Sequence, residues 1–160
     1  MTINFVLNGE PTHLDVEPSD LLVDLLRLRL GLRGARPGCL RGQCGSCAVL
    51  FDGRLAASCL VPAFRVDGSN IVTIEGLMQT REYQDIEKGF ERAKARPCRF
   101  CAAGKFLSVH ALIESEAELT DEAIREILAG VWCRCTTHNR LVRGVKFAAE
   151  YRARRVHRGG

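Results

Sequence analysis

The sequence predicts an α+β protein with a β-rich N-terminal half and a helical C-terminal half. Up to about residue 75, apolar and polar residues alternate around the pairs Asn8-Gly9 and Asp52-Gly53, which is typical of short strands joined by tight hairpins. After about residue 76 the apolar residues recur at helical spacing. The eight cysteines divide into two sets of four, one in each half. We therefore expect two domains, residues 1–76 and residues 77–160.

The N-terminal half should form a small mixed sheet. Residues 3–7 and 14–16 alternate in polarity on either side of Asn8-Gly9, a pair that favours a two-residue hairpin turn. Asp52-Gly53 predicts a second hairpin of the same kind, and residues 71–74 are predicted to form a last strand.

One helix is expected between the two hairpins. Ser19 or Asp20 can cap its start, because a short polar side chain accepts hydrogen bonds from the first helical turn. Gly31 supplies a stop. Five leucines between these points should form one apolar stripe across the sheet: Leu21, Leu22, Leu25, Leu26 and Leu28.

The C-terminal half should form a four-helix domain. Apolar residues keep helical register over four stretches, residues 83–93, 102–114, 124–128 and 139–152. The third helix has a well-marked start, since Thr120 is followed by Asp121 and Glu122, and acidic residues suit the positive end of a helix. The basic run over residues 152–158 is expected to be a solvated tail.

Composition and charge exclude several classes of protein. The net charge is only +4, and no basic stripe interleaved with aromatic residues indicates a nucleic-acid partner. No stretch approaches the roughly 18 consecutive apolar residues of a membrane span, and we find no signal-peptide pattern. Neither a nucleotide-binding motif nor a nucleophile–base pair is present. We therefore expect a cytoplasmic protein, in which cysteines serve as metal ligands more often than as disulfides.

The first cysteine set has the spacing C-x4-C-x2-C, with a fourth cysteine after eleven further residues. It consists of Cys39, Cys44, Cys47 and Cys59. This is the spacing of plant-type ferredoxins. Three glycines of the same loop lack a Cβ atom and let the backbone approach an inorganic core: Gly38, Gly42 and Gly45. Successive N–H groups in such a loop form an anion site. The first set therefore predicts a [2Fe–2S] cluster.

The second cysteine set is a C-x2-C pair and, 31 residues later, a C-x-C pair. It consists of Cys98, Cys101, Cys133 and Cys135. Each pair is expected just before a helix, so that two helix N-termini would present N–H groups to one anionic site. Arg99 and Arg134 lie inside the pairs and add positive charge. The spacing alone fits a second cluster and also leaves a structural zinc ion open.

The motifs around the cysteines carry a resemblance that covers nearly the whole chain. They are residues 38–47, Ser58-Cys59, residues 98–101 and residues 132–136. With this eight-cysteine pattern the chain resembles the iron–sulfur small subunits of the xanthine oxidase family of molybdenum hydroxylases, including the small subunits of carbon monoxide dehydrogenases.

The resemblance implies a β-grasp, plant-ferredoxin-like domain followed by a four-helix [2Fe–2S]-binding domain. The cluster on the first cysteine set would lie nearer a flavin, and the cluster on the second set nearer a molybdenum–pterin cofactor. FAD and the molybdenum–pterin cofactor are expected in partner chains only, an FAD-binding medium subunit and a large molybdenum–pterin subunit. The chain itself would relay electrons between them.

Several residues near the second cysteine set depart from the family pattern. The family usually has Gln-Cys-Gly-Phe-Cys-Thr-Pro-Gly, whereas this chain has Pro97 for the glutamine, Arg99 for the first glycine and Ala102-Ala103 for Thr-Pro. Thr137 replaces a usual glycine. The family glutamine reaches toward the pterin. The resemblance therefore implies an altered surface toward the molybdenum subunit, with all eight cysteine ligands retained.

Two other functions stay open at this point. The chain could be a free-standing ferredoxin-like carrier that docks transiently with its partners. It could also be a regulatory or scaffold protein whose second cysteine set holds zinc. Co-purification with partner chains tests the first alternative, and metal analysis tests the second.

Overall fold

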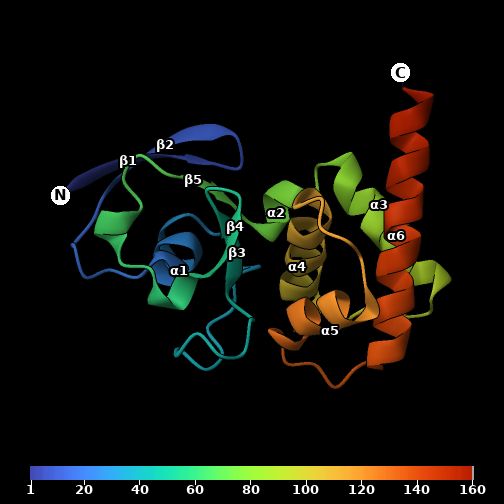
Figure 1. Ribbon diagram of the computed structural model, residues 1–160. Helices are drawn as coiled ribbons and strands as arrows, with labels where there is room; N and C mark the ends of the chain where they lie inside the picture. Colours follow the sequence, from blue (N-terminus) through green and yellow to red (C-terminus); the bar gives the residue numbers. More distant parts are fainter. Residues whose placement is uncertain (160) are drawn as a thin grey trace.

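The computed structural model describes residues 1–159, with a mixed sheet on one side and a group of helices on the other (Figure 1). The five strands have the order β2-β1-β5-β3-β4. Their bounds are β1 (Thr2–Leu7), β2 (Glu10–Asp15), β3 (Ala48–Phe51), β4 (Arg54–Ala57) and β5 (Asn70–Val72). β1 is antiparallel to β2 and parallel to β5, while β3 is antiparallel to both β4 and β5. The predicted mixture of sheet and helix is confirmed.

Both predicted hairpins are present. Asn8-Gly9 joins β1 to β2 and Asp52-Gly53 joins β3 to β4, with positive φ at all four residues, as a turn that matches the twist of the strands requires. The last strand is shorter than predicted, because Ile74 begins the short helix α2 (Ile74–Leu77). The backbone N–H of Thr73 donates to the Asn8 side chain at 2.8 Å instead of continuing the ladder.

The N-terminal helix differs from the prediction in its start and in its geometry. α1 (Leu22–Asp24) continues directly as the π-helix η1 (Leu25–Arg29). Neither Ser19 nor Asp20 caps it, since Leu21 is the residue before the first turn and the Asp20 carboxylate accepts from the N–H of Glu17. The wider π turn moves residues out of an ordinary helical stripe. Leu28 is accordingly 78% exposed, while Leu22, Leu25 and Leu26 are buried.

The four predicted helices of the second half are confirmed. They are α3 (Arg81–Arg92), α4 (Ala102–Glu114), α5 (Asp121–Ala129) and α6 (His138–Arg158). Three of them begin at a threonine whose hydroxyl accepts a backbone N–H of the first turn, at Thr80, Thr120 and Thr137. Two 3₁₀ turns, η2 (Ser58–Leu60) and η3 (Ala63–Arg65), lie between β4 and β5.

Residues 152–158 are mostly exposed, as a solvated run should be, but they continue α6 and do not form a separate tail. Arg155 explains why. Its Nε atom lies 2.8 Å from an oxygen of the buried Asp85, and its Nη2 atom lies 3.1 Å from an oxygen of Glu82. Both acidic residues belong to α3, so the last turns of α6 are held against α3 by charge-assisted hydrogen bonds.

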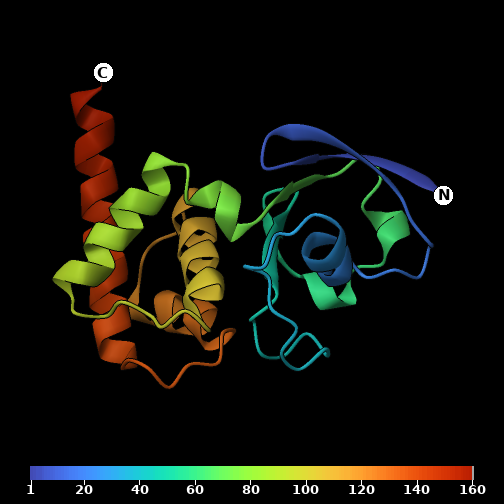
Figure 2. The ribbon, with the colours of Figure 1, turned by 180° about the vertical axis from the view of Figure 1, so that it is seen from behind.

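The strand β3 connects the two halves, because its alternate side chains enter two different cores. Ala48 and Leu50 belong to the core of the helices, whereas Val49 packs with the core between the sheet and α1. α4 lies between the sheet and the pair α3 and α6 (Figures 1 and 2). Hence the two cysteine-bearing halves form one packed body.

Two further expectations concern the chain as a whole. The expected domain boundary after residue 76 falls inside α2, whose Ile74 and Leu77 belong to the helical core, and the division into two domains stays a prediction. Over residues 1–159, no helix has the length and apolar character needed to cross a membrane.

Candidate metal centres

The first cysteine set lies in the loop before β3 and in the turn after β4. Backbone N–H groups of Arg41, Gln43 and Cys44 point at the Cys39 sulfur, at nitrogen–sulfur distances of 3.3, 3.2 and 3.4 Å. These donors lower the pKa of the Cys39 thiol to about 6. Cys39 is therefore a thiolate at neutral pH, which is the form that binds iron.

The glycines of this loop provide both conformation and space. Gly42 and Gly45 have a φ of +71°, a region that residues with a Cβ atom rarely adopt. Gly38 does not need a positive φ, and its role is space, because a Cβ atom there would lie 2.7 Å from the Cys44 sulfur. Sequence reasoning missed Leu40, which also has a positive φ, of +56°. The loop is thus wound tightly around its sulfur atoms.

Cys47 and Cys59 complete the first set from the buried side. Both are less than 4% exposed and pack with Val23 of α1. Burial, together with the neighbouring Cys47 thiol, raises the pKa of Cys59 to about 11. A thiol in such surroundings stays protonated unless a cation displaces its proton. The first set therefore combines a cysteine that favours the thiolate form, Cys39, with the buried thiols of Cys47 and Cys59, and this combination suits a metal centre.

The four sulfur atoms of the second set converge at the N-terminus of α4. The Cys101 sulfur lies 3.7 Å from that of Cys98 and 3.3 Å from those of both Cys133 and Cys135. The sulfur atoms of Cys98, Cys101 and Cys135 all lie within 4.8 Å of one another. Cys101 is also the residue immediately before the first turn of α4. The predicted convergence of the two cysteine pairs is therefore present.

The electrostatics of the second set fit a metal centre held by thiolate ligands. The backbone N–H of Cys101 lowers the pKa of the Cys98 thiol, and the Cys98 N–H donates to the Cys135 sulfur at 3.1 Å. Burial and the crowding of neighbouring thiols raise the pKa of Cys101. The hydroxyl of Thr136 is buried and has no hydrogen-bond partner within residues 1–159. Four crowded thiols beside a polar atom without a partner suit a bound iron–sulfur cluster.

The residues that flank the cysteines of the second set differ in their exposure. Pro97 is buried, whereas Arg99 and Arg134 are exposed. Phe100 and Trp132 are 67% and 64% exposed beside the cysteine pairs. The Arg36 guanidinium lies 5.1 Å from the centre of the Phe100 ring, so Phe100 also touches the loop segment that leads to Cys39. His138, which could have been a ligand, is the exposed first residue of α6.

The two cysteine loops are in direct contact, a feature that the sequence did not predict. The N–H of Trp132 donates to the carbonyl of Cys44 at 3.0 Å. A Cβ atom on Gly45 would lie 2.3 Å from the carbonyl oxygen of Gly130, and one on Gly104 would lie 2.5 Å from that of Gly45. The glycines at positions 45, 104 and 130 were the only sign of this contact in the sequence, because close backbone approach requires glycine.

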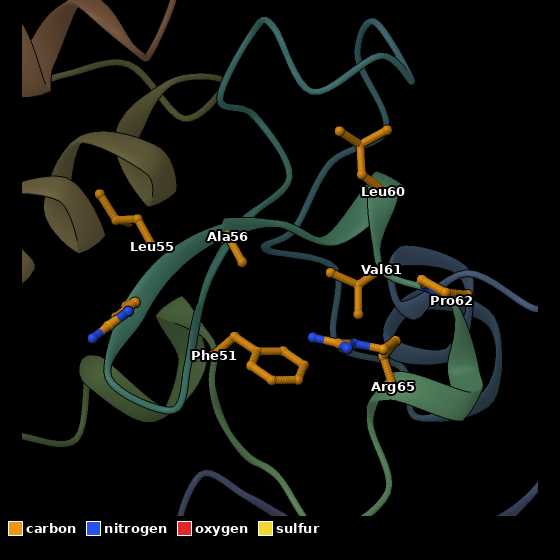
Figure 3. Close-up of a pocket in the computed structure, with 8 residues that line it drawn as sticks. Phe51, Leu55, Ala56, Leu60, Val61, Pro62 and Arg65 are labelled. Atoms are coloured by element: carbon orange, nitrogen blue, oxygen red, sulfur yellow. The ribbon is translucent and has the colours of Figure 1, made fainter.

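A separate hollow of about 340 Å³ lies over β4 and the two 3₁₀ turns (Figure 3). The ring of Phe51 and the guanidinium of Arg65 point into it (Figure 3). No cysteine lines it, and its charged lining residues are Arg54 and Arg65. It therefore contributes no group to either cysteine site.

The fold and the cysteine sites define an iron–sulfur protein. A family model described as "[2Fe-2S] binding domain" matches residues 73–146, a range that contains all four cysteines of the second set. The match favours an iron–sulfur centre over zinc at that set.

Similar proteins match over almost their whole length. The nicotinate dehydrogenase small FeS subunit of Eubacterium barkeri is 36% identical over 150 residues, covering 94% of this chain and 96% of the relative. The xanthine dehydrogenase iron–sulfur-binding subunit of Escherichia coli O157:H7 is 35% identical, covering 91% of this chain and 92% of the relative.

Solved structures of molybdenum hydroxylases contain chains or parts of chains that resemble this chain in fold and sequence. A chain of quinoline 2-oxidoreductase from Pseudomonas putida 86 is similar with a TM-score of 0.84 and 36% identity, covering 96% of both chains. Aldehyde oxidoreductase from Desulfovibrio gigas has a TM-score of 0.85 and 32% identity over 97% of this chain, but over only 17% of that larger chain. This chain therefore belongs to the iron–sulfur small subunits of the molybdenum hydroxylases and is an electron-transfer subunit of an oxidoreductase.

Proposed function

We propose that the chain holds two [2Fe–2S] clusters and relays single electrons between a large molybdenum–pterin subunit and an FAD-binding medium subunit of a cytoplasmic complex. The first cluster belongs to a β-grasp, plant-ferredoxin-like domain over residues 1–76. The second belongs to a helical domain over residues 77–160. Each cluster has four cysteine ligands: Cys39, Cys44, Cys47 and Cys59 for the first, and Cys98, Cys101, Cys133 and Cys135 for the second.

The observation that carries this proposal is the contact between the two cysteine loops. Cys44, a ligand of the first cluster, accepts a hydrogen bond through its carbonyl from Trp132 at 3.0 Å. Trp132 is bonded to Cys133, a ligand of the second cluster. One hydrogen bond and a few covalent bonds therefore separate ligands of the two sites. Because electron tunnelling weakens steeply with distance, this arrangement favours a relay over two unrelated structural centres.

The chain's own residues prepare the first site for the one-electron chemistry that its cluster would supply when bound. The N–H groups of Arg41, Gln43 and Cys44 stabilise negative charge on the Cys39 sulfur. Such hydrogen bonds raise the reduction potential of a cluster, because reduction adds negative charge. Burial of Cys47 and Cys59 keeps water from the inner side of the first site. The bond chemistry of the substrate belongs to the molybdenum–pterin subunit.

Exposed apolar side chains beside each site support docking of two partner chains. Leu40 and Leu60, 55% and 58% exposed, neighbour ligands of the first cluster. Phe100 and Trp132 neighbour ligands of the second. Large apolar side chains gathered at a functional edge are typical of protein interfaces. We assign the leucines to the flavin subunit and the aromatic pair to the molybdenum–pterin subunit.

Purification of the chain from its native source tests the proposal. We expect it to elute with a flavin-containing chain and a molybdenum-containing chain in constant ratio. Phe100→Ser should weaken retention of the molybdenum chain, and Leu40→Ser should weaken retention of the flavin chain. Elution as a separate 17.7 kDa protein that carries both clusters would instead establish a free-standing carrier.

A further inference from the structure

One lysine is completely buried next to the second cysteine set. Lys105 has no exposed surface, and its backbone N–H donates to the carbonyl of Cys101 at 3.0 Å. Its ammonium group donates to the carbonyl of Leu128, in the last turn of α5. The chain runs on from Leu128 to Cys133 within five residues. The Lys105 side chain therefore spans the two segments that carry the two cysteine pairs.

The charge of this lysine has no carboxylate partner. Across residues 1–159, none of the ion pairs includes Lys105. Burial lowers the pKa of Lys105, and the thiolates of Cys133, Cys101 and Cys135 act in the opposite direction. An isolated buried charge is costly unless a charge of opposite sign lies close to it. The nearby negative groups are the sulfur atoms of the second site.

We propose that the ammonium of Lys105 is the built-in counter-charge of the second iron–sulfur cluster and raises the reduction potential of that cluster. This inference rests on the proposed function, since it requires a [2Fe–2S] cluster on the second cysteine set. The reduction step adds one electron from a partner subunit to the cluster with no proton transferred, and the counter-charge requires Lys105 to be protonated in both states of the cluster. A cluster on four thiolates is negatively charged, and each added electron makes it more so. A fixed positive charge therefore stabilises the reduced form more than the oxidised form.

The buried position strengthens this effect. Water would screen the attraction between an exposed lysine and the cluster, whereas a lysine without solvent contact acts through a medium of low dielectric constant. The N-terminus of α4, which begins next to Cys101, directs its partial positive charge to the same side of the site. Lys105 adds a full charge to this partial charge.

A purely structural role makes a different prediction. The Leu128 carbonyl lies at the C-terminal end of α5, where lysine side chains commonly hydrogen-bond to the last carbonyl groups. If Lys105 only fixes the end of α5, another donor should replace it. Lys105→Gln retains an N–H donor without a charge, and Lys105→Met removes both the donor and the charge with little change in length.

Redox titration followed by EPR, on the chain purified with its partner subunits, tests the inference. In both variants we expect the second cluster to shift at least tenfold toward the oxidised form at the wild-type midpoint, a fall of about 59 mV or more. The first cluster of the same molecule should keep its potential. Lys146→Met removes an exposed lysine of α6 that pairs with Asp121, and this control should leave both potentials unchanged.

Other outcomes separate the inference from the proposed function. An unchanged second potential in both variants, or a wild-type potential in Lys105→Gln alone, would overturn the role as a counter-charge. So would variants that keep the first cluster but fail to bind the second, because Lys105 would then be a structural residue. Absence of a second EPR signal in the wild-type protein would instead refute the proposed second cluster itself.

Discussion

The backbone N–H of Trp132 lies 3.0 Å from the carbonyl oxygen of Cys44 and donates a hydrogen bond to it. This contact joins the loop of the first cysteine set to the loop of the second. Gly45, the next residue after Cys44, passes so close to Gly130 that a Cβ atom would lie 2.3 Å from the Gly130 carbonyl oxygen. The loops can approach this closely only because no side chain stands between them.

Gly45→Ala should therefore separate the loops and destabilise the protein. A Cβ atom at positive φ costs about 1–2 kcal/mol, and the clash with Gly130 adds about 1–3 kcal/mol. Gly53→Ala is the matched control, because Gly53 has a φ of +80° but no heavy atom within 4 Å of the added Cβ. Thermal unfolding measures both variants, and a chain of this size loses about 2–4 °C in midpoint per kcal/mol. Equal losses in the two variants would contradict the steric contact.

Arg155→Met should weaken the packing of α6 against α3. The change leaves Asp85, whose side chain is only 8% exposed, and Glu82 without their shared partner, at an expected cost of about 1–3 kcal/mol in unfolding free energy. Arg154→Met removes a neighbouring arginine that is 65% exposed, so its cost should stay below about 0.5 kcal/mol. Urea unfolding of the two variants provides the comparison. A similar small effect at both positions would mean that the end of α6 is not held by Arg155.

Stability should fall at mildly acidic pH because of His110. Burial lowers the pKa of this histidine in the folded protein, although Glu114 and Glu82 partly oppose the shift and Arg152 adds to it. The unfolded chain, with a histidine pKa of about 6.5, then binds the proton more readily than the folded chain does. The contribution of neutral His110 to stability is fully present above about pH 6.5, and it is lost as the pH falls from there toward the folded-state pKa of this histidine.

The pH dependence of the unfolding midpoint, measured between about pH 8 and pH 5.5, checks this expectation. His110→Gln should reduce the slope over this range. His157→Gln, at the exposed end of α6, controls for the loss of a surface histidine and should retain it. A wild-type slope in His110→Gln would assign the acid sensitivity to other groups.

Removal of one ligand from each set should remove the clusters one at a time. Cys47→Ala should lose the first EPR signal and about half of the iron, since each [2Fe–2S] cluster requires its four ligands. Cys101→Ala should lose the second signal and retain the first. EPR and iron analysis of the two purified variants measure this. Loss of both signals in either variant would mean that the sites do not load independently.

Local patterns predicted much of this fold. Both hairpin turns are set by Asn-Gly and Asp-Gly pairs, whose conformational preference acts within a few residues. Thr120 likewise marks the start of α5 through its own hydroxyl. The misses concern partners that are distant in sequence. Ile74 is a β-branched residue of the kind that strands favour, but it packs into the helical core. The helical end of α6 depends on Asp85, which is 70 residues away.

In the candidate sites, too, local patterns were predicted and contacts between distant segments were not. Cysteine spacing predicted two groups of four, and the structure brings Cys98, Cys101, Cys133 and Cys135 together as expected. The contact of Cys44 with Trp132 has no signature in spacing, because it depends on how two separate loops pack. The sequence also contains no sign that Lys105 is buried, because a lysine in a helix is ordinarily exposed. Only the position of α5 over α4 reveals its environment.

The number and kind of clusters is the central claim, and one measurement tests it most directly. The wild-type chain is purified without oxygen and reduced with dithionite, and EPR is recorded with iron and zinc quantified on the same sample. We predict two distinct S = 1/2 signals of equal intensity, about four iron atoms per chain and no zinc. A single signal with about one zinc ion per chain would contradict the relay and leave the second cysteine set as a structural site.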